Sequence, residues 1–173
     1  LTGVYQHGPF PLGDRSPGGI WRPVRIERSG PVRIERLRAV CTSADPAAAT
    51  VSLRAILDVA DRAAPATLRL RTAVGDHVDD RQIPVAAGEN RIEWQVTVPD
   101  PHLWWPRALG EPVMHRLEVT AYTSDGEISD RRRERIGLRS VRLHGSQLSI
   151  NGERLFLKGL EAGPAATPPA RAT

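Results

Sequence analysis

The side chains of this sequence that are able to do chemistry are its acids, its histidines and its one cysteine. Two acids held close together can act as nucleophile and general acid, and clusters of histidine or cysteine can hold metal ions. Most acids here fall in predicted turns or on alternating strand faces, where carboxylates are usually solvated: Asp45, Asp61, Asp76, Asp79, Asp80, Asp125, Glu93 and Glu118. The histidines lack the spacing of metal ligands: His7, His77, His102, His115 and His144. We therefore predict no metal site and no cofactor.

The remaining nucleophiles give no stronger signal. Cys41 is the only cysteine and cannot form an internal disulfide, and its position at the end of an apolar strand predicts a small buried side chain. The serines lack the glycine context of a nucleophile elbow. No glycine-rich loop leads into a helix that would hold a phosphate. The residues alone therefore offer no catalytic centre.

The chain is basic, with a formal net charge of +4, and basic proteins can bind nucleic acid. The arginines are mixed with acids, however, as in residues 33–36 and 130–135, and Lys158 is the only lysine. We interpret this pattern as a compositional bias and predict no binding to nucleic acid. No apolar run approaches the roughly 18 residues of a membrane helix, so we predict no membrane partner. The first residue is Leu1, which favours a fragment of a longer protein and leaves a cytoplasmic or a secreted location open.

An aromatic loop is the most distinctive stretch of the sequence. Two of the four tryptophans, Trp104 and Trp105, stand side by side within residues 100–112, which we call the tryptophan loop. Prolines at 101, 106 and 112 exclude a regular helix or a central strand there. Because adjacent residues of an extended segment point in opposite directions, we expect one indole to pack on the domain and the other to face outward. The alternative, that both indoles are buried within the domain, stays open.

The segments on both sides of the tryptophan loop alternate apolar with polar residues, which predicts β-strands. The expected strands are 32–41, 49–59, 66–73, 81–85, 90–98, 113–123 and 127–139. Trp94 lies on the apolar face of its strand and is expected in the core. Residues 49–63 are rich in alanine, which favours a helix, but their period of two favours a strand. About seven short strands with one apolar face each predict an all-β protein, an immunoglobulin-like antiparallel β-sandwich.

A β-hairpin is expected after the sandwich. Asn151 and Gly152 separate segments 147–150 and 153–156, and this dipeptide favours a two-residue type I′ turn because both turn residues take positive φ. Residues 155–160 then form a mostly apolar run, which predicts the start of a buried strand.

Four motifs in a fixed order carry a resemblance to a known family. They are Gly-Ile-Trp-Arg-Pro-Val at 19–24, Pro-His-Leu-Trp-Trp-Pro at 101–106 with Gly-Glu-Pro at 110–112, Arg-Ile-Gly-Leu-Arg at 135–139, and Ile-Asn-Gly at 150–152 with Leu-Phe-Leu-Lys-Gly at 155–159. The sequence resembles family 2 of the glycoside hydrolases, the β-galactosidase, β-mannosidase and β-glucuronidase group. By this resemblance, residues 1–27 are the tail of an N-terminal jelly-roll sugar-binding-type domain and residues 28–142 the immunoglobulin-like sandwich. Residues 143–173 are then the entry hairpin and first strand of a (β/α)8 catalytic barrel, with a disordered tail.

The resemblance implies that catalysis occurs elsewhere in a parent protein. Retaining β-glycosidases use two carboxylates about 5 Å apart, which in this family come from the barrel, and no residue of this chain matches either. Glu161 follows the expected first barrel strand and is a candidate to line a pocket of the parent. The fragment itself is expected to be noncatalytic. Its partners would be the jelly-roll and barrel domains of the same chain, and it would meet a glycan substrate only through the parent.

The resemblance also implies a contact surface between domains, formed by Trp104, Trp105, Pro106 and Arg139. A second hypothesis makes the chain a carbohydrate- or protein-binding sandwich module that acts without the barrel, through exposed aromatic side chains. A third, an enzyme complete in itself, has no candidate acid/base pair. Binding of a glycan by the fragment alone would favour the second hypothesis over the first.

Overall fold

The computed structural model describes residues 23, 24, 26–60 and 67–159. Within them, Arg28–Phe156 form one compact unit, which is built from β-strands with no helix in the described residues. The search for a long apolar helix able to cross a membrane finds none in the described part of the chain. Glu161, proposed above to line a pocket, lies outside the described residues, as do the loop at 61–66 and the last residues of the chain.

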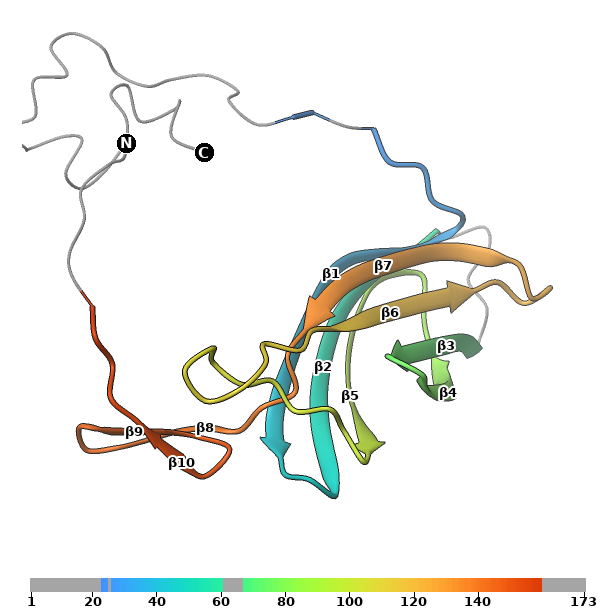
Figure 1. Cartoon of the computed structure of the whole chain (residues 1–173). Helices are drawn as coiled ribbons and strands as arrows, with labels where there is room; N and C mark the ends of the chain where they lie inside the picture. Colours follow the sequence, from blue (N-terminus) through green and yellow to red (C-terminus); the bar gives the residue numbers. More distant parts are fainter. Residues whose placement is uncertain (1–22, 25, 61–66, 160–173) are drawn as a thin grey trace, which may run out of the picture. The chain divides into compact units, whose positions relative to one another are not determined.

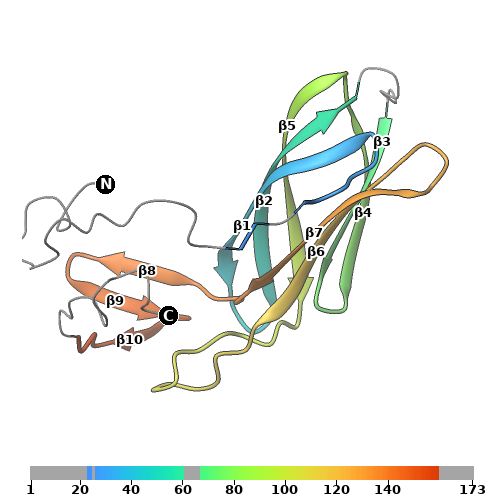
Figure 2. The ribbon, with the colours of Figure 1, turned by 90° about the horizontal axis from the view of Figure 1, so that it is seen from above.

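Seven strands form two antiparallel sheets that face one another (Figures 1 and 2). The first sheet has the order β1-β2-β5, with β1 at Val32–Ala44, β2 at Ala48–Val59 and β5 at Gly88–Pro99. The second has the order β4-β3-β6-β7, with β3 at Thr67–Val74, β4 at His77–Pro84, β6 at His115–Tyr122 and β7 at Ile128–Ile136. The predicted all-β, immunoglobulin-like sandwich is therefore confirmed. In immunoglobulin constant domains the fourth strand joins the first sheet, whereas here β4 pairs with β3.

The core lies between the two sheets and follows the predicted alternation. On β2, every second side chain from Val51 to Val59 is buried, and on β6 Leu117, Val119 and Ala121 are fully enclosed. Each buried branched side chain contributes about 1.5–3 kcal/mol to folding. The helical alternative for residues 49–63 is wrong for its described part, because a period of two buries one face of a strand and no face of a helix.

A buried hydrogen bond between two side chains joins the two sheets. Trp94 of β5 is 7% exposed, which confirms it as a core residue. Its Nε1–H donates to Oγ1 of Thr72 on β3 at 3.0 Å, and Thr72 is fully buried. The bond satisfies the only polar atom of the indole, so the large ring is buried without the cost of an unpaired donor.

Strand β4 begins four residues earlier than predicted. The sequence placed Asp79 and Asp80 in a turn, but both lie inside β4, directly after a two-residue turn at Gly75. Asp80 is held by Arg69, with a closest N–O distance of 2.6 Å, and Asp79 is held by Arg81 at 2.6 Å. Ion pairs across and along the strand thus let acids occupy a segment whose composition is typical of a turn.

The open edge of β1 is closed by side chains of β7 rather than by a backbone ladder. Ser129 Oγ accepts a hydrogen bond from Val32 N–H and donates one to Val32 O, both at 2.8 Å. Asp130 Oδ2 accepts from Ile34 N–H at 2.7 Å, and Arg132 Nε donates to Ile34 O at 2.8 Å. We call this contact the β1–β7 seam. It satisfies four backbone groups that an edge strand otherwise exposes.

A third, smaller sheet follows the sandwich, with the order β10-β9-β8. It consists of β8 at Val141–His144, β9 at Gln147–Ile150 and β10 at Glu153–Leu155. The predicted turn is confirmed: Asn151 and Gly152 have φ of 51° and 90°, and Ile150 pairs directly with Glu153. Strand β8 was not predicted. A second tight turn, in which Gly145 has a φ of 58°, folds it against β9.

The seam generates a prediction about stability. Ser129→Ala removes one hydroxyl but leaves both Val32 backbone groups buried without partners, so we expect a loss of about 1–3 kcal/mol in the free energy of unfolding. Urea denaturation followed by circular dichroism measures it. Ser124→Ala, in an exposed turn, is the control and should change stability by less than about 0.5 kcal/mol. Equal small losses for both variants would mean that the seam does not hold β1.

Candidate functional site

The tryptophan loop leaves the end of β5 through a sharp change of direction at Asp100, whose φ is 44°. Its N–H donates to the Ala47 carbonyl at 3.0 Å, and Pro101 is buried. Two residues further on, the His102 carbonyl lies 2.7 Å from Nε2 of His115, the first residue of β6. The start of the loop is therefore fixed to the sandwich at two points.

Trp104 packs against the segment that follows β7. Its N–H donates to the carbonyl of the buried Leu138 at 2.8 Å. A Cβ built on Gly137 would lie 2.9 Å from Trp104 Cγ, so only glycine permits this approach. The Arg139 guanidinium carbon lies 4.2 Å from the centre of the indole ring, a cation–π contact worth about 0.5–2 kcal/mol. Residues 137–139 therefore form the seat of Trp104.

Trp105 packs against its own loop instead. Its N–H donates to the Glu111 carbonyl at 2.9 Å, and the Pro106 carbonyl accepts from the Leu109 and Gly110 N–H groups at 2.8 and 3.1 Å. This turn brings Gly110 against the indole, where a Cβ would lie 3.0 Å from Trp105 Cβ. Both tryptophans are half-buried. Trp104 thus packs on the sandwich, as expected for one of the two indoles, while Trp105 packs on its own loop, and the outward direction of the second indole stays a prediction.

Asn151 ties the tryptophan loop to the small sheet. Its side-chain Nδ2 donates to the Trp104 carbonyl at 3.0 Å, and its Oδ1 accepts from Ser140 N–H at 2.9 Å. Its own N–H donates to the Ser140 carbonyl at 2.8 Å. The sequence indicated only the turn-forming role of this residue. One signal in the sequence could have indicated this second role. The residue at the first turn position is asparagine, whose amide both donates and accepts, whereas an aspartate would only accept.

Cys41 lies near this end of the sandwich and is half-buried, less than the sequence suggested. Burial raises the pKa of the thiol above its ordinary value of 9.0, and the backbone N–H and positive charge of Arg139 partly oppose that effect. A raised pKa keeps the group protonated at neutral pH and suppresses its reactivity as a nucleophile.

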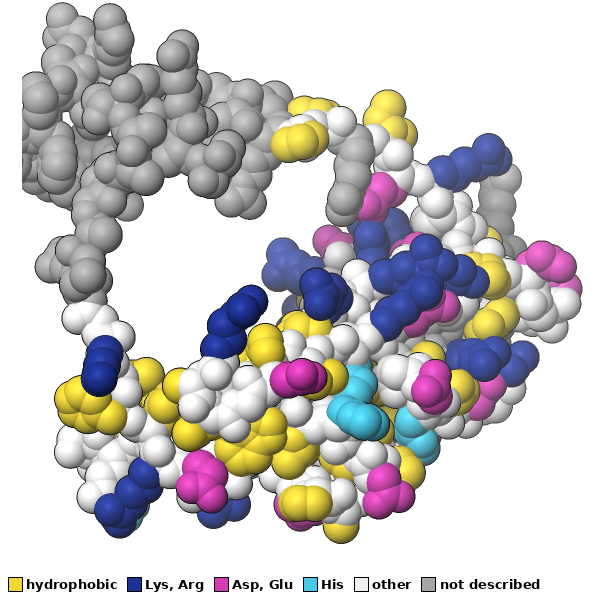
Figure 3. Space-filling model, viewed as in Figure 1, with side chains coloured by type: hydrophobic (Ala, Val, Ile, Leu, Met, Phe, Trp, Pro, Cys, Tyr) yellow, Lys and Arg dark blue, Asp and Glu magenta, His cyan; other side chains and the backbone are white. Residues whose placement is uncertain are grey.

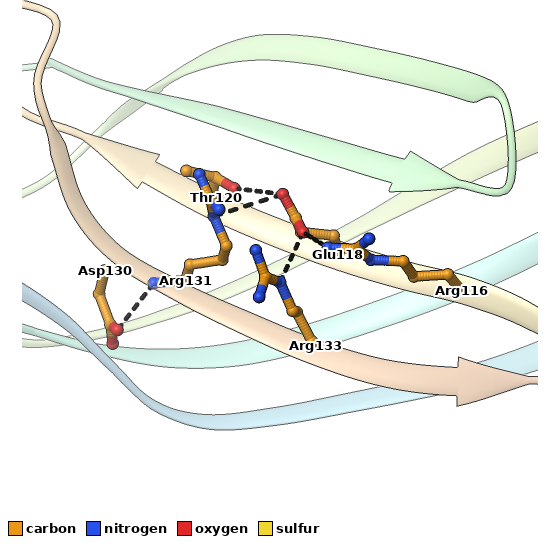
Figure 4. A network of polar contacts seen from close by, with 6 residues as sticks. All are labelled: Arg116, Glu118, Thr120, Asp130, Arg131 and Arg133. Carbon is orange, nitrogen blue, oxygen red and sulfur yellow. Dashed lines mark hydrogen bonds and ion pairs between the residues drawn. The ribbon is translucent and has the colours of Figure 1, made fainter. Parts of the chain in front are cut away.

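Glu118 on β6, which the sequence placed among solvated charges, is partly enclosed and lies among three arginines (Figure 4). Its Oε2 accepts from Arg116 Nη2 at 2.7 Å and from Arg133 Nε at 2.8 Å, and Arg131 Nε lies 3.3 Å from Oε1. Burial alone would raise its pKa, but the hydrogen bonds from Arg133 and Arg116 and the nearby charges hold the pKa below its ordinary value. Glu118 is thus a structural counterion.

Four of the predicted site residues meet at one corner of the sandwich: Trp104, Trp105, Pro106 and Arg139. Among the described residues no group of three histidine, cysteine, aspartate or glutamate side chains is placed to hold a metal ion.

The fold defines the described chain as an immunoglobulin-like sandwich with an aromatic corner. The model of Glycosyl hydrolases family 2 matches residues 32–139, and the chain belongs to that family. The match confirms the resemblance carried by the four motifs and covers the sandwich from the start of β1 to Arg139.

Relatives of known activity are glycosidases. An exo-β-D-glucosaminidase of Streptomyces avermitilis is 28% identical over 154 residues, which cover 82% of this chain and 17% of the relative. A β-glucuronidase of Sus scrofa is 35% identical over 88 residues, which cover 49% of this chain and 14% of the relative. Among solved structures, the exo-chitosanase CsxA of Amycolatopsis orientalis has a TM-score of 0.66 at 24% identity and supports the fold, over 80% of this chain and 17% of that one. The chain spans less than a fifth of each relative.

The role of Asn151 can be separated from that of its turn. Asn151→Gly keeps a residue that accepts positive φ and keeps the backbone bond to the Ser140 carbonyl, but it removes the side-chain bonds to the Trp104 carbonyl and the Ser140 N–H. We therefore expect the turn to persist and the small sheet to loosen from the loop. Amide hydrogen exchange at Ser140 should accelerate by about tenfold, the equivalent of one hydrogen bond. Ser146→Gly, in the other turn of the small sheet, is the control for added backbone freedom. Unchanged exchange at Ser140 in Asn151→Gly would contradict the bracing role.

Proposed function

We propose that this chain is a noncatalytic sandwich domain of a family 2 glycosidase. In this proposal the corner formed by Trp104, Trp105, Pro106 and Arg139 docks on the domain that carries catalysis, which the resemblance identifies as a (β/α)8 barrel. The sandwich spaces and supports that domain. The observation that carries the proposal is a stiff, half-exposed aromatic corner whose every anchor lies within the sandwich unit.

The electrostatics support a noncatalytic role. The general acid of a glycosidase requires a pKa raised toward neutrality. The described carboxyl groups whose pKa is shifted all have it lowered: Asp80 by a hydrogen bond from Arg69, Asp125 by a hydrogen bond from Thr123, and Glu118 by its arginines against the opposing effect of burial. Each of these acids is held ionised, a state that suits an ion pair and does not suit proton donation.

The composition and stiffness of the corner support docking. Tryptophan and arginine dominate the energetics of protein interfaces, and a loop already fixed by hydrogen bonds at Trp104 and Trp105 loses little entropy when it meets a partner. The second hypothesis, a module that holds glycans on exposed aromatics, gains less support. Arg139 covers one face of Trp104, and Gly110 lies against Trp105, which reduces the free ring surface for a sugar.

For the parent protein we propose hydrolysis of O-glycosyl bonds by a retaining mechanism. The support is membership of the family and the glycosidase activities of the relatives, which include glucosaminidases, glucuronidases and a β-galactosidase. These relatives differ in the sugar they act on, so the substrate of the parent is defined only as a β-glycoside.

The chain alone should not hydrolyse glycosides. We expect no release of nitrophenol from β-mannoside, β-galactoside, β-glucuronide or β-glucosaminide substrates above the buffer rate, because no residue of this chain matches either of the two catalytic carboxylates that the resemblance places in the barrel. Absorbance assays across the purification measure it. Activity that follows the protein through successive columns would contradict the noncatalytic assignment.

If the corner docks on another domain, replacing Trp105 should weaken the association between domains more than it lowers the stability of the sandwich itself. In a mixture of this chain with the separately produced remainder of the parent, Trp105→Ala should weaken association by about tenfold or more, as an interface hot spot does. Its effect on the unfolding of the isolated sandwich should be small, since the contacts of Trp105 with Gly110 and Glu111 lie within its own loop. Isothermal titration and urea unfolding give the two values. Val78→Ala, an exposed apolar residue on β4, is the control, and equal affinities for the two variants would rule out docking through the corner.

A further inference from the structure

The outer face of the second sheet carries a dense group of arginines. The register of strands β3, β6 and β7 places these residues in rows across the sheet. One row is Arg71, Thr120 and Arg131, and the next is Ala73, Glu118 and Arg133. In a third row Arg116 lies beside Arg135. We call this group the arginine face, defined by Arg71, Arg116, Arg131, Arg133 and Arg135. Figure 3 shows dark blue side chains gathered over β6 and β7.

The sequence indicated that these charges were mixed with acids, and along the chain they are. In space they separate, because a period of two places Arg131, Arg133 and Arg135 on the outer side of β7 and turns Asp130 toward β1. Glu118 contacts three of the five guanidinium groups, those of Arg116, Arg131 and Arg133. Arg71 lies opposite Asp80 in register, and the acids of this face together leave an excess of positive charge. The neighbouring Arg69 does not add to this excess, since Asp80 pairs with it through two hydrogen bonds.

The guanidinium groups of this face have unused hydrogen-bonding capacity. Arg131 Nε lies within ion-pair distance of Glu118 but not in hydrogen-bond geometry, and this buried atom has no acceptor in the structure. Arg116 and Arg135 lie directly opposite one another, an arrangement of like charges that costs stability. Among the described residues the side chain of Arg135 makes no ion pair or hydrogen bond. Glu118 balances the charge of Arg116, whereas that of Arg135 is left without a counterion, which favours an external anion at this end of the face.

The spacing of the arginines fits an extended partner. Arg131, Arg133 and Arg135 recur at every second residue of β7, an edge strand of its sheet, so their Cα atoms follow a line with steps of about 6.8 Å. A flexible linear chain with a negative charge on each repeating unit can contact several of these groups at once. Weak individual ion pairs then combine into a useful affinity.

We propose that the arginine face binds a linear polysaccharide that carries a carboxylate on its repeating sugars. The planar fork of arginine matches a carboxylate with two parallel hydrogen bonds. The surface is separate from the tryptophan loop, and its binding requires no catalytic residue. In a glycosidase it would hold an acidic polymer near the enzyme, whatever bond the enzyme cleaves.

Two other classes of partner fit the face less well. Single-stranded nucleic acid requires free aromatic platforms, and the tyrosine of this sheet face, Tyr122, has Arg69 over its ring at 4.9 Å. A protein partner requires an apolar centre, whereas the exposed apolar side chains of this sheet, Val78 and Ile128, lie at its margins. A hydrated, charged polymer needs neither feature.

The test compares binding of polygalacturonate with binding of the same polymer after full methyl esterification, which removes the charge and keeps the sugar chain. We expect micromolar binding of the acid form at about 20 mM salt, a steep loss by about 200 mM, and no binding of the ester. Arg133→Gln/Arg135→Gln should weaken binding by about tenfold. The matched control is Arg36→Gln/Arg38→Gln, which removes the same charge from exposed positions on β1 and should change affinity by less than about twofold.

Each other result overturns the proposal. Equal weakening by the two double variants would mean attraction by net charge alone, and equal binding of the ester would mean that the carboxylates are not recognised. Tighter binding of single-stranded DNA or of polyglutamate at the same salt would assign the face to another class of partner. If the double variant loses its near-ultraviolet dichroism, Arg135→Gln alone replaces it, since the side chain of Arg135 forms no bond within the described structure. That variant should still weaken polygalacturonate by about threefold, and unchanged affinity would also overturn the proposal.

Discussion

The β1–β7 seam is the constraint on which the rest of the structure depends. A sandwich of two open sheets leaves edge strands with unpaired backbone groups, and β1 would expose those of Val32 and Ile34. Three side chains of β7 satisfy these groups across 96 to 98 residues of sequence. Gly30 supports the same contact: its N–H donates to the Ser129 carbonyl at 2.6 Å, and a Cβ there would lie 2.7 Å from Ser129 Oγ. The seam thus fixes the position of β7 against the first sheet.

Both candidate surfaces follow from the position of β7. The strand leads directly into Gly137, Leu138 and Arg139, which seat Trp104. Trp104 in turn offers its carbonyl to Asn151, so the small sheet is held through the loop. The side of β7 that faces away from the seam carries the arginine face. A single strand with a period of two therefore closes the sandwich with one set of side chains and presents charge with the other.

The sequence was sufficient for the strands and their buried faces but not for the contacts that join them. Alternation along β2 and β6 reports which side of a strand is apolar, and the structure bears it out. The alternation does not indicate which other residue a side chain will contact. Ser129 and Asn151 are short polar residues whose functions depend on backbone groups far away in the sequence, and nothing local distinguishes them from solvated neighbours. The arginine face could not be predicted for the same reason. Arginines and acids alternate along the chain, and only the pairing of strands shows that the arginines gather on one face of the sheet.

Not every arginine of that face needs a ligand to explain it. Thr120 points to the outer side of its sheet and is only 2% exposed, although an outward position is ordinarily solvated. Its neighbours in register are Arg71 and Arg131, and the long apolar stems of arginine can cover such a site while the charged ends reach water. Packing therefore accounts for those two arginines, as the ion pair with Glu118 accounts for Arg133. Neither explanation reaches Arg135, which opposes Arg116 and has no counterion in the described structure. The positive charge of Arg135, at this end of β7, is therefore the one that the stability of the domain does not explain. In the proposal an external anion binds there first.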